Sequence, residues 1–580
     1  MKISKPFKLI FLASIVINIT ILSSLAQEWH IETVDKSGQP GDSSSIAIDK
    51  SGFPHIVYSN YATDSFKYAY KNENGWQIST YSQEPKLFIG SRSLKFDDEG
   101  HPHIGYATKS GIKYAYGTFS GTTLTFDTFT IDPQGFAPTV LTVDRGGKMP
   151  KIIYFGGFAQ YGSDTLMLAE HGYYGGWSSH IIDRNVVHGY ADISLNLNGY
   201  PVISNFAVRD PYTVLRDLFY YQDKSGVTVI LPSLDKISFG EYVSMARKHD
   251  INYFAYQGDG SLYYTNGMAW LDCSSGVWHY TTYDKEEVKK KAEIPLFCFA
   301  SLAVNGNQPV MCYRALDNSN KYYLEYAWKD SSGWHFSTID KVDTNAPSLI
   351  LDGFNRPFIS YHDTSDPSNV VLKYAWKDSV TISHITPTSG LSSDSQMQMD
   401  IFPSTGYTFW PNPHFNDDIM PDTTVLLRKN GQNDVLALGV INIGTQIRCW
   451  FDLKGVANGA WDVVVQVPYA RPLELKGGFN VGSSSGSGSS PSPSIGWVNG
   501  RVVDQQGLGI PTAEIWVDNL PTSIMTDNLG NYRLSLNPGT HRLAAKKAGF
   551  GIPPRGVYVN VGGNISQNLV GREYINLSSG

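Results

Sequence analysis

A strand–turn–strand pattern recurs along this chain. Its clearest copy runs from Ser45 to Tyr58 and reads SIAIDKSGFPHIVY, in which two segments of alternating apolar and polar residues flank a turn containing Gly and Pro. Close or degraded copies end at Tyr106, Tyr154, Asn205, Tyr256, Tyr313 and Tyr361. The seven copies lie 48 to 57 residues apart, a period typical of propellers and solenoids rather than of one irregular domain.

Further strand-like segments accompany each copy. In the first unit, KYAYK at 67–71 follows a polar loop, and WQISTY at 76–81 ends the unit. Equivalents of the third segment lie at 113–116, 218–221, 262–264, 324–328 and 372–376. Four strands in each repeat are typical of one propeller blade, so the seven units predict seven blades.

The two ends of the repeat array complement each other. The seventh unit lacks a fourth strand after LKYAW at 372–376, whereas an orphan WHIETV at 29–34 precedes the first unit and resembles WQISTY and WHFSTI. We expect the N-terminal strand to complete the last blade, which closes the ring and removes exposed sheet edges. The predicted fold is therefore all-β: a seven-bladed β-propeller over residues 27–378, closed by the N-terminal strand and followed by two β-sandwich domains.

The first 26 residues have the pattern of a secretory signal peptide. Three lysines precede an apolar run from Leu9 to Leu22, and Ser24-Leu25-Ala26 provides a cleavage site. The alternative is an uncleaved membrane anchor, for which this run is short. No second apolar run approaches this length, so we expect a secreted or cell-surface protein without a membrane span in the mature chain.

Charge and cysteine content exclude several classes of function. The formal net charge is −7 and becomes more negative once the three lysines of the signal peptide are removed, so nucleic acid is not an expected partner. Cys298 and Cys312 lie on adjacent predicted strands and could pair, with Cys273 as a competitor, whereas Cys449 is expected to be a buried free thiol. No CxxC or HExxH motif occurs, so we expect neither a metal nor a cofactor.

The repeat text resembles a known group of propellers. The pattern S-x-x-x-D-x-x-G-x-P-H-I-x-Y, followed by K-Y-A and G-x-W, is similar to exported bacterial and archaeal β-propeller repeats grouped with sialidase-like and lectin-like propellers. The resemblance covers residues 27–378 and concerns architecture. The sialidase Asp-box pattern S-x-D-x-G-x-x-W is not found, so the resemblance does not extend to sialidase chemistry.

Two further domains follow the repeats. Residues 379–481 open with ITPTSG and close with strand-rich text that resembles an IPT/TIG-type immunoglobulin-like sandwich, which implies a spacer or binding module. Residues 482–494, GSSSGSGSSPSPS, form a flexible linker. Residues 495–571 resemble a carboxypeptidase regulatory-like, transthyretin-type sandwich through G-x-V-x-D-x-x-G-x-x-I-P-x-A and T-D-x-x-G-x-Y-x-L, which implies an accessory module without catalytic residues; 572–580 are a tail.

Histidine and acidic residues near the strand ends are candidates for a site. His55 and His103 occupy a repeat position, which favours packing and hydrogen bonding over catalysis. The column directly after the repeated Tyr becomes polar in the last three units; it reads Ser59, Ala107, Phe155, Phe206, Gln257, Arg314 and His362. We hypothesise a polar ligand site around Arg314, His362 and Asp363, with Asp317 and Gln257 nearby, against the alternative of ordinary loop polarity.

Polar groups beside Tyr and Trp rings suit sugars, whose hydroxyls need hydrogen bonds and whose apolar faces stack on rings. The sequence thus favours a non-catalytic recognition protein that binds a polysaccharide or a cell-surface glycan or protein. The alternatives are a purely structural component and a polysaccharide-degrading enzyme, a lyase or glycoside hydrolase, in which Arg314 would neutralise a uronate and His362 with Tyr361 or Tyr313 would act as base. The loop at 363–369 could hold Ca²⁺ or be a plain loop. Ligand identity and oligomeric state stay open.

Overall fold

The structure is a computed structural model. It describes residues 29–37, 40–60, 62–83, 88–121, 123–143, 149–158, 164–172, 175–195, 200–208, 216–222, 227–230, 243–248, 251–258, 261–272, 277–289, 299–305, 308–377, 380–404, 409, 423–442, 445–482, 496–504, 507–517, 520–536, 539–547, 550–552, 554–559 and 564–573. The predicted signal peptide and nearly all of the linker at 482–494 lie outside these residues. Throughout the described ranges the secondary structure is β, with no helix.

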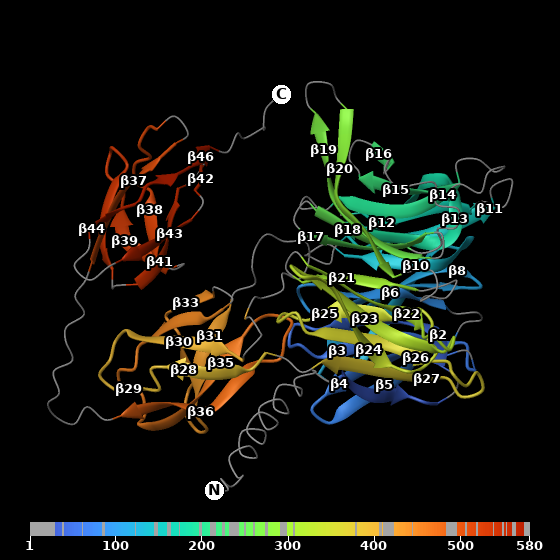
Figure 1. Ribbon diagram of the computed structural model, residues 1–580, viewed down its shortest axis with the longest axis horizontal. Coiled ribbons are helices and arrows are strands. Elements are labelled where there is room, and N and C mark those ends of the chain that lie inside the picture. Colours follow the sequence, from blue (N-terminus) through green and yellow to red (C-terminus); the bar gives the residue numbers. More distant parts are fainter. Residues whose placement is uncertain are drawn as a thin grey trace, which may run out of the picture. The chain divides into compact units, whose positions relative to one another are not determined.

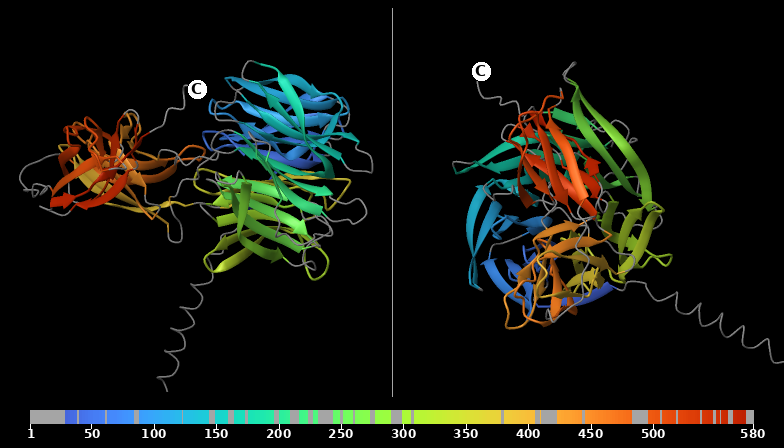
Figure 2. Two further views of the ribbon diagram at one scale, coloured as in Figure 1. Left: turned by 90° about the horizontal axis from the view of Figure 1, so that it is seen from above. Right: turned by 90° about the vertical axis from the view of Figure 1, so that its left-hand side faces the viewer.

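The chain divides into two compact units. The first comprises residues 1–379, 410–422 and 467–471, and the second comprises 380–409, 423–466 and 472–580. In the first unit the sheets follow one another in chain order around a common centre (Figures 1 and 2).

Each of five sheets in the first unit has four antiparallel strands. The first two are β2 (Pro40–Ile48), β3 (Pro54–Asn60), β4 (Ser65–Asn72), β5 (Gly75–Gln83), and β6 (Phe88–Phe96), β7 (Pro102–Thr108), β8 (Gly111–Ser120), β9 (Thr123–Asp132). The next two are β17 (Val243–Lys248), β18 (Ile251–Gly258), β19 (Ser261–Asp272), β20 (Val277–Lys289), and β21 (Ser301–Asn305), β22 (Gln308–Leu316), β23 (Tyr322–Asp330), β24 (Gly333–Asp340). The last contains β25 (Ser348–Leu351), β26 (Pro357–Asp363), β27 (Val371–Lys377) and β1 (Trp29–Asp35).

The N-terminal strand belongs to the sheet of the last repeat. β1 runs antiparallel to β27, with Trp29 opposite Lys377 and Thr33 opposite Lys373. It takes the outer position of a sheet whose order is β1-β27-β26-β25. The orphan WHIETV segment therefore supplies the strand that the seventh repeat lacks in its own sequence.

The third and fourth repeats share one sheet. Its seven strands are β10 (Gly135–Thr142), β11 (Lys151–Phe158), β12 (Asp164–His171), β13 (Trp177–Leu195), β14 (Pro201–Val208), β15 (Arg216–Gln222) and β16 (Val227–Ile230). The first part of β13 pairs with β12, and its last part, from Ala191, pairs with β14 after a register shift. The strand that ends one repeat thus continues into the strand that begins the next, which the separate repeats of the sequence did not predict.

The apolar faces of neighbouring sheets pack on each other. One cluster combines Val57 and Phe66 of the first sheet with Leu94 and Tyr106 of the second. β3 is buried at every position because both of its faces are covered. The repeated tyrosines are fully buried in these layers; they are Tyr58, Tyr106, Tyr154, Tyr313 and Tyr361. The repeated Tyr is therefore a core residue of the packed layers.

Side chains near the centre tie the innermost strand of one repeat to that of the next. A hydroxyl or carboxylate oxygen accepts a hydrogen bond from a backbone N–H of the following repeat, at 2.7 to 3.3 Å. The pairs are Leu94 to Ser45, Met245 to Asp192, Leu302 to Ser244, Leu349 to Ser301 and Ile46 to Ser348. The last pair joins β2 to β25, so the first and seventh repeats lie side by side.

The second unit contains two sets of sheets. The earlier set consists of β28 (Ile382–Thr386), β30 (Met397–Pro403), β34 (Ile447–Phe451), β33 (Gly439–Asn442), and β29 (Ser389–Leu391), β36 (Leu473–Gly482), β35 (Gly459–Gln466), β31 (Thr424–Arg428), β32 (Val435–Leu436). The later set consists of β40 (Asn531–Leu536), β37 (Gly496–Val503), β44 (Asn564–Ser566), β45 (Leu569–Val570); β39 (Leu520–Met525), β38 (Glu514–Val517), β41 (Gly539–Lys546), β43 (Arg555–Val559); and β42 (Phe550–Gly551), β46 (Arg572–Glu573). The buried side chains of the later set form one apolar cluster that includes Val498, Ile515 and Leu543.

Candidate functional site

Arg314, at the centre of the predicted site, is held by its neighbours. It lies on β22, and its guanidinium is 2.6 Å from the carboxylate of Asp343 and stacks 3.8 Å over the ring of Tyr322. Asp343 in turn accepts a backbone hydrogen bond from Thr364 and donates one to Ser365. Arg314 is thereby linked through Asp343 to the loop that follows Asp363.

Asp363 belongs to a second group of charges on the same loop. Lys373 lies 2.9 Å from both Asp363 and Asp340, and Asp340 accepts a 2.8 Å hydrogen bond from Tyr361. Burial alone would raise the pKa of Asp363, but the hydrogen bonds from Lys373 and Ser365 outweigh it and lower that pKa. The structure thus connects Arg314 and Asp363 in one network in which both charges are already paired.

The other predicted residues do not join this network. His362 is fully buried, neither ring nitrogen has a hydrogen-bond partner in the described part of the chain, and desolvation lowers its pKa to about 3. Because its side chain points into the packed layer between sheets, it cannot touch a ligand on the surface. Asp317 is exposed and caps a tight turn by accepting the N–H groups of Ser319 and Lys321. The side chain of Gln257 lies outside the described residues.

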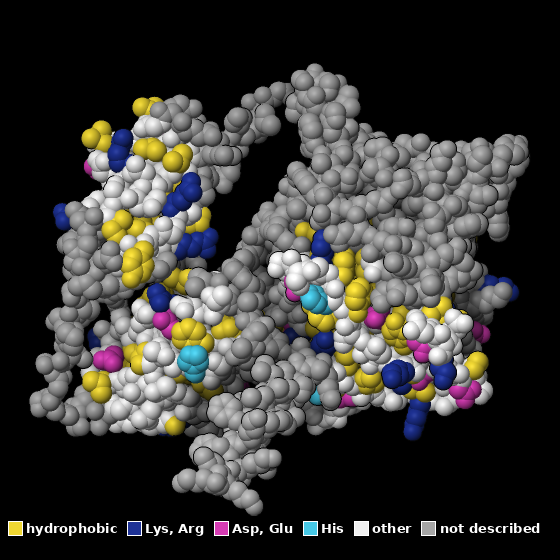
Figure 3. Space-filling model, viewed as in Figure 1, with side chains coloured by type: hydrophobic (Ala, Val, Ile, Leu, Met, Phe, Trp, Pro, Cys, Tyr) yellow, Lys and Arg dark blue, Asp and Glu magenta, His cyan; other side chains and the backbone are white. Residues whose placement is uncertain are grey.

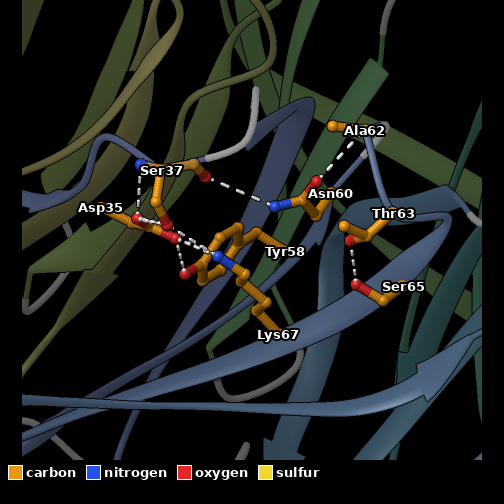
Figure 4. A network of polar contacts seen from close by, with 8 residues as sticks. All are labelled: Asp35, Ser37, Tyr58, Asn60, Ala62, Thr63, Ser65 and Lys67. Atoms are coloured by element: carbon orange, nitrogen blue, oxygen red, sulfur yellow. Dashed lines mark hydrogen bonds and ion pairs between the residues drawn. The ribbon is translucent and has the colours of Figure 1, made fainter.

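The Tyr–Asp–Lys arrangement at Tyr361 recurs in the first repeat. Tyr58 donates a 2.6 Å hydrogen bond to Asp35, and Lys67 lies 2.8 Å from the same carboxylate (Figure 4). Ser37 binds the other oxygen of Asp35 through its N–H and its hydroxyl. The triad of Tyr58, Asp35 and Lys67 joins the last sheet to the first one, and we call it a clamp between sheets. Tyr361, Asp340 and Lys373 form a second such clamp, in which the lysine also pairs with Asp363.

The repeated histidines have the structural role that the sequence predicts. His103 is fully buried between Asp97 and Tyr114, with ring nitrogens 3.3 Å from the carboxylate and 2.6 Å from the hydroxyl. His55 makes the equivalent contacts with Asp49 and Tyr68. Burial would raise the pKa of Asp97, but its hydrogen bonds from His103 and His101 lower it to about 2.

Arg92 crosses the centre of the first unit, which the sequence did not suggest. It precedes the repeat Ser93, lies 2.8 Å from Asp192, and donates to Ser244 and to the carbonyl oxygens of Met245 and Leu302. The sequence signal is a lone arginine in a column otherwise filled by Ser, Thr, Ala, Val or Pro. This guanidinium has four partners from three other repeats. It therefore links these repeats and is not free to bind an anion.

Lysines surrounded by aromatic rings lie between neighbouring sheets. Lys71, the last residue of KYAYK, stands 4.7 to 6.0 Å from the ring centroids of Trp76, Tyr374 and Trp376. Glu32 neutralises it at 2.6 Å and also accepts a 3.1 Å hydrogen bond from the indole of Trp76. We call these five residues the Lys71 cage.

An equivalent group surrounds Lys377. Its ammonium stands 4.9 to 5.5 Å from the ring centroids of Trp29, Tyr326 and Trp328, and the indole of Trp29 donates a 3.1 Å hydrogen bond to Ser337. Desolvation by these rings lowers the pKa of Lys377 to about 8. Trp29, Trp328, Ser337 and Lys377 are each partly exposed, so this Lys377 cage can be reached from solvent.

The residues of both cages occupy repeat positions that can be identified in the sequence. The lysines lie at the end of the third strand of their repeats, the ring pairs come from Y-A-W, and a Trp lies at the start of the fourth strand. What the sequence could not supply is which ring of one repeat meets which lysine of the next. In Figure 3, hydrophobic side chains lie beside cationic and acidic ones over the region of β5, β24 and β27.

The described residues include two buried free thiols. In the described ranges no group of three or more His, Cys, Asp and Glu side chains is placed to hold a metal, and no helix there is long and apolar enough to cross a membrane. Cys312 and Cys449 are buried free thiols, and burial raises the pKa of both. The considered pairing of Cys312 with Cys298 or Cys273 is therefore not formed, because Cys312 is enclosed in an apolar cluster with Leu324 and Tyr361.

Comparisons with known proteins identify one domain. Residues 498–570 match the carboxypeptidase regulatory-like domain, as the sequence predicts for the C-terminal sandwich. The chain matches no curated protein.

Solved structures resemble part of the chain. AofleA from Arthrobotrys oligospora is 13% identical, with a TM-score of 0.35 over 54% of this chain and 90% of that one. A thermostable family-43 glycoside hydrolase is 11% identical, with a TM-score of 0.29 over 53% of this chain and 95% of that one. A mutant of the NanB sialidase from Streptococcus pneumoniae is 9% identical, with a TM-score of 0.32 over 62% of this chain and 72% of that one.

Proposed function

We propose that this protein is a non-catalytic carbohydrate-recognition protein and that its repeat unit carries the binding surface. The observation that carries the proposal is the pair of lysine–aromatic cages between sheets. Each has partly exposed indole rings beside an ammonium group, over a buried Tyr ring. Pyranose rings stack their apolar C–H faces on such rings while their hydroxyls bind adjacent polar groups.

The proposal includes a specific architecture and location. Residues 27–378 form seven blades closed into a ring, residues 379–481 form an IPT/TIG-like sandwich, and the mature chain is secreted or displayed at a cell surface. Pairing of β1 with β27 and the Ile46-to-Ser348 hydrogen bond support a closed ring. The partners are then a polysaccharide or a cell-surface glycan.

The predicted acid–base residues support binding rather than catalysis. His362, the candidate base, is fully buried, and its lowered pKa of about 3 means that the ring stays a neutral imidazole at neutral pH. Arg314, the candidate for uronate neutralisation, is already paired with Asp343. A general base must come within hydrogen-bond reach of the proton it removes, and His362 cannot reach a polymer that remains in solvent.

Affinity electrophoresis of the full chain in gels containing neutral or acidic polysaccharides tests the proposal. We expect at least one polymer to retard the protein. Trp328→Ala removes a partly exposed cage ring and should restore most of the mobility, whereas Phe129→Ala removes an exposed ring outside both cages and should not.

Polymer length and the retardation of the variant distinguish binding from degradation. Size-exclusion chromatography of the retarding polymer should show unchanged chain length, and a shortened polymer would assign degradation instead. Retardation by none of the polymers would overturn carbohydrate recognition through the cages. Equal retardation of the Trp328→Ala variant, with an unchanged melting temperature, would overturn recognition through the Lys377 cage.

A further inference from the structure

The two cages are built from equivalent positions of neighbouring repeats. In both, the lysine is the last or second-last residue of the third strand and faces a Trp of the adjacent outer strand: Lys71 is opposite Trp76, and Lys377 is opposite Trp29. In both, the preceding repeat supplies a Tyr and a Trp, and a His stacks on that Trp at 5.1 to 5.2 Å. The same frame is therefore present twice in one molecule.

Within the described residues, one difference between the frames changes the charge beside the lysine. Glu32 is placed where its carboxylate contacts both the ammonium of Lys71 and the indole N–H of Trp76. The equivalent residue of the Lys377 cage is Ser337, which accepts only the indole hydrogen bond of Trp29. No acidic side chain of the described residues pairs with Lys377; Asp378, next in the chain, lies outside them. Among the described residues, the Lys71 cage therefore has a carboxylate at its lysine and the Lys377 cage has none.

From this difference we infer that the Lys377 cage binds a carboxylate-bearing sugar, a uronate residue of an acidic polysaccharide, whose carboxylate takes the place that Glu32 occupies in the Lys71 cage. The inference deepens the proposed function and rests on it. The ammonium of Lys377 supplies the charge, and the rings of Trp29 and Trp328 supply the stacking surface.

Charge and geometry favour a carboxylate over a neutral sugar. An ammonium held among three rings is partly desolvated, so an ion pair formed there is worth more than one in open solvent. The carboxylate of Glu32 shows that this frame accommodates such a group between a lysine and an indole N–H. A neutral sugar would leave the ammonium of Lys377 without a counter-charge, whereas in the Lys71 cage Glu32 already supplies that charge.

Isothermal titration of the full chain with an oligogalacturonide, and with its methyl-esterified form as the matched neutral probe, tests the inference. We expect the acid form to bind at one site and at least tenfold more tightly than the ester. Ser337→Glu installs the internal carboxylate of the sister cage and should weaken acid binding at least tenfold. Lys377→Met keeps the length of the side chain without its charge and should do the same.

The opposite substitution, in the Lys71 cage, should create binding instead of removing it. Glu32→Ser releases Lys71 from its internal partner and should add a second site for the acid form. Acid binding that survives Ser337→Glu and Lys377→Met unchanged, with melting temperatures like that of the parent, would overturn the inference.

The two proposals fail in different ways. Binding of neutral polymers that depends on Trp328 but not on Ser337→Glu would keep carbohydrate recognition and reject the uronate site. Binding of no polymer at all would reject both.

Discussion

The hydroxyl of Tyr58 donates a 2.6 Å hydrogen bond to the carboxylate of Asp35, and this bond ties the first sheet to the strand that completes the last one. Asp35 is buried and has Lys67 and Ser37 as its other partners. The same relation joins Tyr361 to Asp340. Tyr58 and Tyr361 are thus both core residues and donors of hydrogen bonds between repeats.

Tyr58→Phe should destabilise the first unit by about 1.5 to 3 kcal/mol, because a hydrogen bond to a buried charged group is lost while the ring still fills its place. Urea titration of the full chain measures the free energy of unfolding. Tyr322→Phe, which alters an exposed ring, should change it by less than about 0.5 kcal/mol. Equal changes in the free energy of unfolding for the two variants would show that the Tyr58–Asp35 hydrogen bond does not stabilise the first unit.

Asp97 should make stability depend on pH below about 4. Its pKa is about 2 in the folded protein, below the usual value, so the unfolded chain binds a proton first as the pH falls. The contribution is complete above pH 4 and is lost toward pH 2, to a total of about 2 kcal/mol. Unfolding of Asp97→Asn and parent protein between pH 2 and 6 should show a gap that narrows with acid; a constant gap would contradict this.

His362 should act in a separate pH window. Its pKa is lowered to about 3 in the folded protein. Between pH 6.5 and 3 the imidazole is therefore protonated in the unfolded chain but stays neutral in the folded one. The folded state therefore loses about 1.4 kcal/mol per pH unit below 6.5 from this group. His362→Phe, which places the residue found at Phe155 in the same column, should be less sensitive to acid between pH 7 and 5. If both proteins lose stability in parallel, His362 is not buried neutral.

Two glycines of the carboxypeptidase regulatory-like domain form a matched pair. Gly530 and Gly507 both have positive φ, at 79° and 84°. A Cβ on Gly530 would lie 2.4 Å from the carbonyl oxygen of Val502, whereas one on Gly507 meets nothing within 4 Å. Gly507→Ala should cost about 1 to 2 kcal/mol for its backbone conformation, and Gly530→Ala should cost more because the carbonyl must also move. Hydrogen exchange of β37 in the full chain measures the difference; equal protection in the two variants would contradict it.

Local patterns made much of the fold predictable. Alternation and turn residues marked β3 and its copies, and the text WHIETV matched the fourth strand of other repeats, so the pairing of β1 with β27 followed from a count of strands. The motifs of the C-terminal sandwich likewise indicated the domain that residues 498–570 match. The continuous β13 escaped prediction because the text between the third and fourth repeats does not mark where one strand becomes the next.

The candidate site was less predictable, and the reason is physical. The polar column after the repeated Tyr did identify Arg314 and His362 as unusual, but the partners that decide their chemistry come from elsewhere: Asp343 neutralises the first, and packed neighbours bury the second. A column in an aligned repeat gives residue type and approximate face, and it cannot give the electrostatic environment.

By itself, the sequence determined the β class, the repeat period and the strand that completes the last repeat, because these depend on local alternation, turn chemistry and repeated text. Only the tertiary structure decided which charges are satisfied. Lys71 and Lys377 occupy equivalent positions near the ends of their strands, and among the described residues their charge environment differs through one residue of the neighbouring sheet, Glu32 or Ser337. Whether an ammonium is already neutralised depends on side chains from different sheets. The distance between such side chains is set by how the sheets pack and not by their order along the chain.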